Sequence, residues 1–97
     1  MERTAIYLMP DWQCFPLWAP GGDPYNVDPR DLGLSGRLCD ELMEWARDYD
    51  TLLSPLHPSL SGFQRAEERD SFWRRGEILK REIERERPDL DIQLRIT

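Results

Sequence analysis

Proline and glycine confine regular structure in this chain to a few segments. Residues 10–34 hold most of them: Pro10, Pro16, Pro20, Gly21, Gly22, Pro24, Pro29 and Gly33. Proline lacks a backbone N–H and glycine favours turns, so we predict one long loop here, without a regular element. The loop also carries aromatic side chains, among them Trp12, Phe15 and Trp18. Because such rings are costly to leave in water, a loop of this length either packs on itself or has a function.

Two segments have the composition of strands. Residues 4–9 form a short apolar run with β-branched and aromatic side chains, and Pro10 ends it. In residues 90–97, apolar side chains alternate with polar ones: Leu90, Ile92, Leu94 and Ile96. This alternation predicts a strand with one buried and one solvated face.

Two helices are expected between these strands. Apolar residues recur at helical spacing over residues 35–52, where Ser35 is placed to cap the helix. A turn-rich connection at residues 54–62 precedes a second helix, expected at about residues 64–87 and ended by Pro88.

The order strand, long loop, helix, helix, strand predicts a single α+β domain over residues 1–97. Two strands alone make a marginal sheet, so the helices must cover its apolar face as a hairpin. If consecutive elements are simple neighbours, the two strands pair antiparallel. Gly76 falls in the buried stripe of the second helix, where glycine costs about 1 kcal/mol relative to alanine. We therefore expect another element to approach the helix closely at Gly76.

The net charge of −6 is unevenly distributed. Residues 1–50 hold ten acidic residues and four arginines, whereas residues 51–97 hold nine acidic and nine basic residues. An acidic half repels nucleic acid and anionic membranes and attracts basic proteins. We therefore expect a basic protein partner, no nucleic acid and no membrane. The alternative is that the charge only keeps the chain soluble.

Few residues here are suited to catalysis or metal binding. Cys14 and Cys39 are too few for a disulfide scaffold, and His57 is the only histidine. With no signal peptide and no apolar run of membrane length, we expect a cytoplasmic protein with reduced thiols. Two separated cysteines and one histidine are too few for a zinc site, and Gly21-Gly22 alone is not a phosphate loop. We therefore predict no metal, no cofactor and no catalytic residue. A cryptic enzyme that uses a cysteine with His57 remains an alternative.

The long loop is the first candidate partner-binding site. Its tryptophans would anchor a partner and its carboxylates would surround them: Asp11, Trp12, Trp18, Asp23 and Asp28. Tryptophan and tyrosine dominate binding hot spots, so Tyr25 is a third candidate anchor. The alternative is that the rings complete a core that is short of strands.

The polar face of the first helix is the second candidate. It carries four carboxylates: Asp40, Glu41, Glu44 and Asp48. Two like-charge pairs stand four residues apart, and each should destabilise the helix by about 0.2–0.5 kcal/mol. Arg37 and Arg47 offset this only in part. Such a departure from local preference indicates a function, and the alternative is an ordinary solvated face.

Two motifs carry a resemblance to other proteins. Residues 6–18 read I-Y-L-M-P-D-x-x-C-x-P-L-W, and residues 28–35 read D-P-x-D-L-x-L-S. Both resemble a group of short uncharacterised proteins of high-GC bacteria, and the element order extends the resemblance to most of the chain. In size, acidity and α/β plan the chain is also similar to immunity proteins of bacterial toxin systems.

Together these features predict a protein-binding module without catalysis. The resemblance implies an immunity-type or antitoxin-like protein that occludes a basic partner through its acidic face. Two alternatives stay open. One is a small structural or regulatory protein that forms a homodimer through strand edges. The other is the cryptic enzyme with Cys14 and His57.

Overall fold

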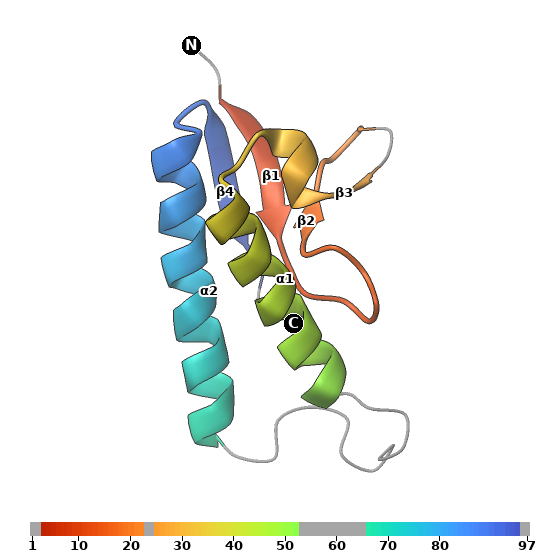
Figure 1. Ribbon diagram of the computed structural model, residues 1–97, viewed down its shortest axis with the longest axis vertical. Helices are drawn as coiled ribbons and strands as arrows, with labels where there is room; N and C mark the ends of the chain where they lie inside the picture. Colours follow the sequence, from red (N-terminus) through yellow and green to blue (C-terminus); the bar gives the residue numbers. More distant parts are fainter. Residues whose placement is uncertain (1–2, 23–24, 53–65, 96–97) are drawn as a thin grey trace.

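The computed structural model describes residues 3–22, 25–52 and 66–95 (Figure 1). These residues form four strands, a 3-10 helix and two long helices. In chain order these are β1 (Thr4–Leu8), β2 (Leu17–Trp18), β3 (Asn26–Val27), η1 (Pro29–Leu32), α1 (Gly36–Leu52), α2 (Ala66–Glu86) and β4 (Leu90–Leu94). The expected α+β class is confirmed. Both helices start and end close to the expected residues, whereas the predicted connection at 54–62 lies outside the described residues.

The sheet differs from the predicted one. It is four-stranded and mixed, with the order β3-β2-β1-β4. β2 pairs antiparallel with β1 and with β3, but β4 pairs parallel with β1, so that Ile6 lies opposite Ile92. The expected two-stranded antiparallel sheet is therefore wrong in strand number and in direction.

The cause lies in residues 10–34, which we predicted to be one long loop. After β1 the chain turns back through β2, and Met9 N–H donates to the Pro16 carbonyl at 2.9 Å. The Asn26 amide then holds β2 to β3, donating to the carbonyls of Phe15 at 2.7 Å and Leu17 at 3.1 Å. Polar contacts of a side chain thus supplement two strands that are too short to show as a hydrophobic pattern.

This reversal also explains the direction of β4. The β2–β3 hairpin and η1 return the chain toward the start of β1, so α1 runs in the same direction as β1 (Figure 1). α2 then runs back, and β4 follows it parallel to β1. A parallel pair needs a long crossover, and the two helices supply it.

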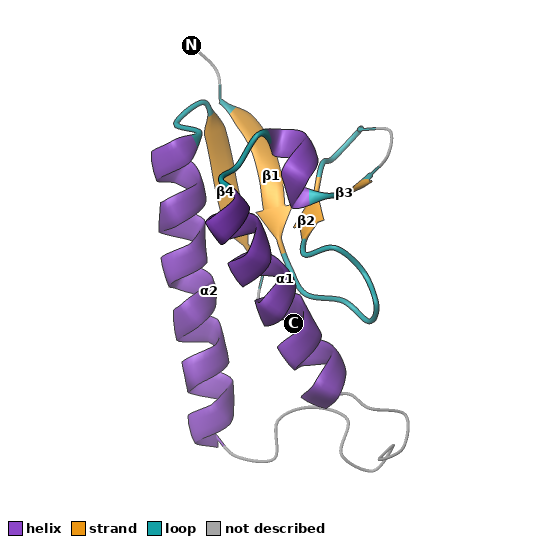
Figure 2. Ribbon diagram, viewed as in Figure 1, coloured by secondary structure: helices purple, strands orange, loops and turns teal. Residues whose placement is uncertain are grey.

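The helices cover one face of the sheet (Figure 2). Ile6, Leu8, Leu90 and Ile92 are buried on that face. On the opposite face the Arg95 guanidinium lies 4.3 Å from the centre of the Tyr7 ring. Between the helices the rings of Trp45 and Phe72 stack with their centres 4.6 Å apart. The core therefore lies between α1, α2 and the inner face of β1 and β4.

Gly76 of α2 lies at a close approach between elements of this core. A Cβ atom placed on Gly76 would lie 2.9 Å from Cζ2 of Trp45 and 3.2 Å from Cδ1 of Leu94. Real Cβ atoms essentially never have a contact as short as the first. The expectation that glycine allows another element to come close is confirmed, with α1 and β4 as the elements concerned.

The ends of the two helices are tied together at Ser35. As expected for an N-cap, its Oγ accepts from Leu38 N–H at 3.3 Å. The Ser35 N–H and hydroxyl also donate to the Glu86 carboxylate at 2.6 and 2.7 Å. This contact fixes the start of α1 against the last turn of α2. Within the described ranges, neither helix is long and apolar enough to cross a membrane.

Candidate partner-binding surface

The exposed face of α1 carries the carboxylates that the sequence singled out. The side chains of Glu44 and Asp48 are 58% and 55% exposed. Asp40 is exposed as well, and its side chain has no hydrogen bond or ion pair with any residue that the structure describes. Glu41 is partly buried and pairs with Arg37 at 2.9 Å. All four carboxylates therefore lie on the outer side of α1, but they differ in exposure and in their ion pairs.

Arg75 of α2 relieves the like-charge repulsion on α1. Its Nη1 lies 3.3 Å from Glu44 Oε1 and 3.4 Å from Asp48 Oδ2. Sequence reasoning missed this residue because the pairing depends on how α1 and α2 pack. One signal was present, since Arg75 is adjacent to Gly76, where α2 lies close to the Trp45 side chain of α1. The repulsion between carboxylates of α1 is therefore smaller in the folded protein, where Arg75 lies between them, than in the isolated helix.

The turn at residues 11–14, which carries the exposed Trp12, is tied to α1 through Gln13. The Trp12 side chain is 38% exposed. Two backbone groups of the turn are held by carboxylates. The Trp12 N–H donates to Asp11 Oδ1 at 2.7 Å, and the Gln13 N–H donates to Asp50 Oδ1 at 2.9 Å. Gln13 has a φ of 55°, a left-handed conformation that is uncommon for residues other than glycine. Trp12 is therefore displayed by a fixed turn and not by a loose loop.

The other tryptophan of the loop belongs to the core. Trp18 is 9% exposed, and its Nε1–H donates to the Met9 carbonyl at 2.9 Å. Tyr25 packs on it with ring centres 5.2 Å apart and is 49% exposed. The alternative that the rings complete the core thus describes Trp18, whereas Trp12 and Tyr25 face solvent in part.

The two remaining loop carboxylates differ in status. Asp23 lies outside the described residues. Asp28 caps η1, accepting from Arg30 N–H at 3.0 Å, and pairs with the Arg30 guanidinium at 2.7 Å. Hydrogen bonds from Arg30 hold the pKa of Asp28 below its usual range. Asp28 also lines a groove of about 320 Å³ together with Asp40 and Glu44.

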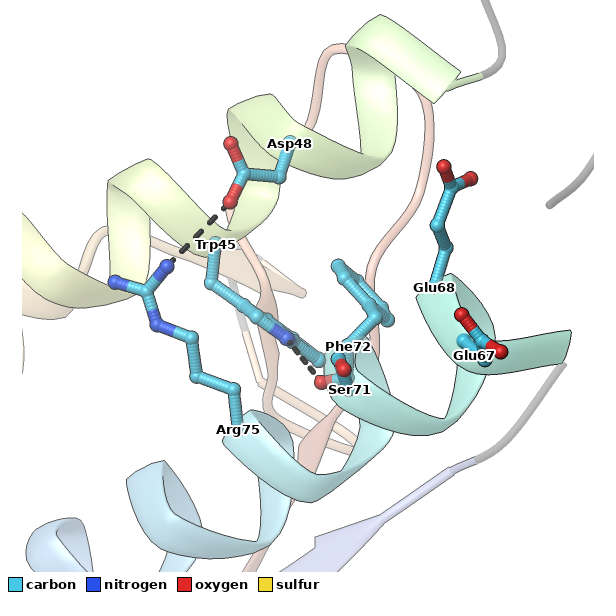
Figure 3. A pocket seen from close by; sticks show the side chains of 7 residues that line it. All are labelled: Trp45, Asp48, Glu67, Glu68, Ser71, Phe72 and Arg75. Carbon is cyan, nitrogen blue, oxygen red and sulfur yellow. Dashed lines mark hydrogen bonds and ion pairs between the residues drawn. The ribbon is translucent and has the colours of Figure 1, made fainter. Parts of the chain in front are cut away.

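A larger cavity opens between α1 and α2, and no sequence pattern predicted it. It has a volume of about 510 Å³. Trp45 and Phe72 form its apolar floor, and charged or polar side chains form its rim (Figure 3): Asp48, Glu67, Glu68, Ser71 and Arg75. Glu67 and Glu68 make no ion pair with any other residue in the described part of the chain. The cavity is thus apolar at its base and rimmed mainly by carboxylates.

Neither cysteine has the environment of a nucleophile. Burial raises the pKa of the Cys14 thiol, and the neighbouring Asp11 and Asp50 raise this pKa further. Burial is also the main cause that raises the pKa of Cys39. A reactive thiol needs a lowered pKa, because the thiolate is the nucleophile. His57 lies outside the described residues. In residues 3–22, 25–52 and 66–95, no group of three or more His, Cys, Asp or Glu side chains is placed to hold a metal ion.

These features define a small α+β protein whose exposed surface groups acidic side chains along one helix. Over residues 4–92 the chain matches a family described as Serratia CdiI immunity protein-like, and it belongs to this family. No curated protein is similar enough to count as a match. The matched residues extend from the start of β1 into β4. Membership in an immunity-protein-like family points to a role in binding a protein toxin, and such families are generally not catalytic.

Proposed function

We propose that this chain is an immunity protein that binds a basic toxin and blocks it without catalysis. The binding surface in this proposal is the acidic face, defined as Asp11, Trp12, Asp40, Glu41, Glu44, Asp48 and Asp50. The observation that carries the proposal is the family match over residues 4–92. The geometry of α1 and of the turn at 11–14 supports the choice of surface.

Charge supports a basic partner. The whole net charge of −6 comes from residues 1–50, where acidic residues outnumber arginines by ten to four. On the acidic face Asp40 is unpaired among the described residues, and Glu44 and Asp48 share the single guanidinium of Arg75. Such a surface attracts a basic protein over a distance and speeds encounter, more than it adds to affinity once bound.

Trp12 supports a specific contact at the same surface. A partly exposed tryptophan beside carboxylates is the type of residue that dominates interface hot spots. Because hydrogen bonds to Asp11 and Asp50 fix the turn before binding, little conformational freedom is lost on association. Trp18 and Asp28 act indirectly in this proposal, since they hold β2 and η1 in place.

The two other hypotheses have less support. A homodimer through strand edges would use β4, but its Ile92 N–H already donates to Glu84 Oε2 at 3.3 Å. A cysteine enzyme would need a lowered thiol pKa, and that of Cys14 is raised. The cytoplasmic location and the origin in high-GC bacteria remain part of the proposal.

The test is purification of the tagged chain from its source bacterium, with washes at low and at high salt. We expect one basic protein to be retained at low salt. That protein is then expressed in a second host, alone and together with the chain. Growth arrest that only the co-expressed chain relieves would support an immunity function. A retained protein that is harmless alone, or whose toxicity the chain does not relieve, would contradict it.

A further inference from the structure

The side of α2 that points away from the core carries basic side chains. Four residues spaced three or four positions apart share this side, and we call them the basic stripe: Arg74, Ile78, Arg81 and Arg85. All four are exposed, and Ile78 is 50% exposed. The basic stripe is thus a positively charged surface on a chain whose net charge is −6.

The three arginines of the basic stripe have no ion pair or hydrogen bond with any residue that the structure describes. Carboxylates stand near them in the sequence of α2, but in the fold these face other elements. Glu82 lies 3.7 Å from Arg37 of α1. Glu86 accepts a hydrogen bond from the Ser35 hydroxyl at 2.7 Å. The described part of the chain therefore does not neutralise the charge of the basic stripe.

We infer that the outer surface of the two helices is an interface between two copies of this chain. In this dimer the basic stripe of each copy faces the carboxylates of α1 in the other copy. Both helices lie on the same face of the sheet, so their outer sides point in the same direction (Figure 2). A two-fold axis roughly parallel to the helices places α1 of one copy over α2 of the other. Both contacts then form at once, and the assembly closes at two copies.

The charges of the two helices lie at matching heights. Arg37 of α1 is level with Glu82 of α2, since they lie 3.7 Å apart. Farther along, Asp48 is level with Arg75, with 3.4 Å between Oδ2 and Nη1. An axis along the helices keeps these heights. In the dimer Asp48 of one copy is therefore level with Arg74 of the other.

Asp40 meets the other end of the basic stripe in the same way. It follows Arg37 by three residues, which is less than one helical turn. Because α2 runs antiparallel to α1, Asp40 lies within one turn of the height of Arg81. The dimer thus brings acidic side chains to arginines near both ends of the basic stripe.

Charge complementarity selects a second copy as the occupant of the basic stripe. Asp40 has no ion pair among the described residues, and Glu44 shares the guanidinium of Arg75 with Asp48. In the dimer, carboxylates and arginines without strong partners satisfy one another. Ile78 gives the contact an apolar centre. A single exposed isoleucine is ordinary on a monomer, so the inference depends on its place among three unpaired arginines.

The dimer adds a control on the proposed function. Asp40, Glu44 and Asp48 belong to the acidic face, so a second copy and a basic toxin would compete for the same carboxylates. A toxin therefore has to separate the two copies before it binds. The dimer itself is formed by this chain alone, so it can be tested without a toxin.

The first experiment is sedimentation velocity of the free chain over about a hundredfold range of concentration. We expect the sedimentation coefficient to rise towards that of a dimer, and to return to that of a monomer at high salt, where charges are screened. A native chain that stays monomeric at every concentration would overturn the inference.

Variants locate the interface. Arg74→Glu with Arg81→Glu should weaken self-association at least about tenfold. Arg3→Glu with Arg95→Glu makes the same change in net charge beside β1 and β4 and should have little effect. Circular dichroism confirms that each variant folds. Equal weakening by both pairs, or none by the first, would place the contact elsewhere and overturn the inference.

A charge exchange gives the sharpest test. Asp40→Lys with Glu44→Lys should also prevent self-association, but a mixture of this variant with Arg74→Glu with Arg81→Glu should form a heterodimer. The reversals change the net charge of −6 by four in opposite directions, to −2 and −10. Since both variants stay acidic, attraction between net charges cannot cause the pairing. A mixture that remains monomeric would contradict the proposed pairing of α1 with α2.

The same measurements separate this interface from the proposed function. A chain that forms the dimer but relieves no toxicity would support the interface and contradict the immunity function. A chain that is monomeric at every concentration and still neutralises the captured toxin would support the immunity function and overturn the interface.

Discussion

Gly76 sets how closely α2 can pack against its neighbours. In Gly76→Ala the new methyl group would meet the buried Trp45 ring at 2.9 Å, and stacking on Phe72 prevents this ring from moving easily. Overpacking of a core costs about 1–3 kcal/mol, of which the better helix propensity of alanine returns about 1 kcal/mol. We expect a net loss of about 1 kcal/mol in the free energy of unfolding, measured with urea.

Gly36 provides the matched control for this prediction. It begins α1, and nothing lies within 4 Å of a Cβ atom placed on it. Gly36→Ala should therefore leave stability unchanged or slightly raised, through the unfolded state. An equal loss in both variants would show that Gly76 has no special packing role.

Trp12 should matter for binding more than for folding. Because its ring is partly exposed on a turn, we expect Trp12→Ala to change the unfolding free energy by no more than about 1 kcal/mol. We expect the complex with the captured partner to dissociate about tenfold faster or more. Tyr25→Ala removes a partly exposed aromatic ring that packs on Trp18 and does not belong to the acidic face as defined, and it should leave dissociation unchanged. Surface plasmon resonance measures both rates, and equal effects would contradict a specific role of Trp12.

The role of a single residue could be predicted from the sequence where it depends on the local pattern, whereas contacts between distant segments could not. Ser35 as a cap and Gly76 as a close approach follow from the residue type and its place in a helix. The partners of Arg75 and Glu86 depend on the angle and register between two helices. Trp12 and Trp18 look alike in the sequence, and only the β1–β2 pairing decides that Trp18 is the buried one.

The link between Ser35 and Glu86 makes the packing of α1 against α2 sensitive to acid. Hydrogen bonds from the Ser35 hydroxyl and N–H lower the pKa of Glu86 from its ordinary value of 4.5. A carboxylate with a lowered folded-state pKa adds stability above its unfolded pKa, and this stability is lost as pH falls through the folded value. We therefore expect Glu86→Gln to be less stable than the native chain at pH 7. The difference should shrink below a pH of about 4.5, as urea unfolding at several pH values can measure.

Glu77→Gln is the control for this effect. Glu77 is exposed on α2 and has no hydrogen bond with another residue of the described ranges. The stability of this variant should follow that of the native chain at every pH. A constant difference between Glu86→Gln and the native chain from pH 7 to pH 3 would contradict the linkage to Ser35.

The strengths and limits of sequence prediction are clearest for the strands and helices. The long amphipathic segments predicted both ends of α1 and α2 to within two residues, and the alternation of apolar residues predicted β4. β2 and β3 are two residues each, too short for any periodicity, and the Asn26 side chain that links them is visible only in space. Because the hairpin was missed, the direction of β4 relative to β1 was missed as well.

Across the whole molecule, exposed carboxylates lie in two separate places, on the acidic face around α1 and on the far side of α2. Arg75 reaches α1 from one flank of α2, while Glu84 contacts β4 from another flank, on which Glu77 also lies. Asp70 and Glu77 therefore provide carboxylates that are exposed but remote from the acidic face. They allow a change of charge at the acidic face to be separated from a change in the net charge of the chain.

The most direct test of the account is the association rate of the captured toxin as a function of salt. Asp40→Lys with Glu44→Lys reverses charge on the acidic face, and Asp70→Lys with Glu77→Lys makes the same change in net charge on the far side of α2. At low salt we expect the first pair to slow association about tenfold and the second pair to have little effect. At high salt, where charges are screened, all rates should converge. Equal slowing by both pairs, or no slowing by the first, would contradict a toxin-binding surface on α1.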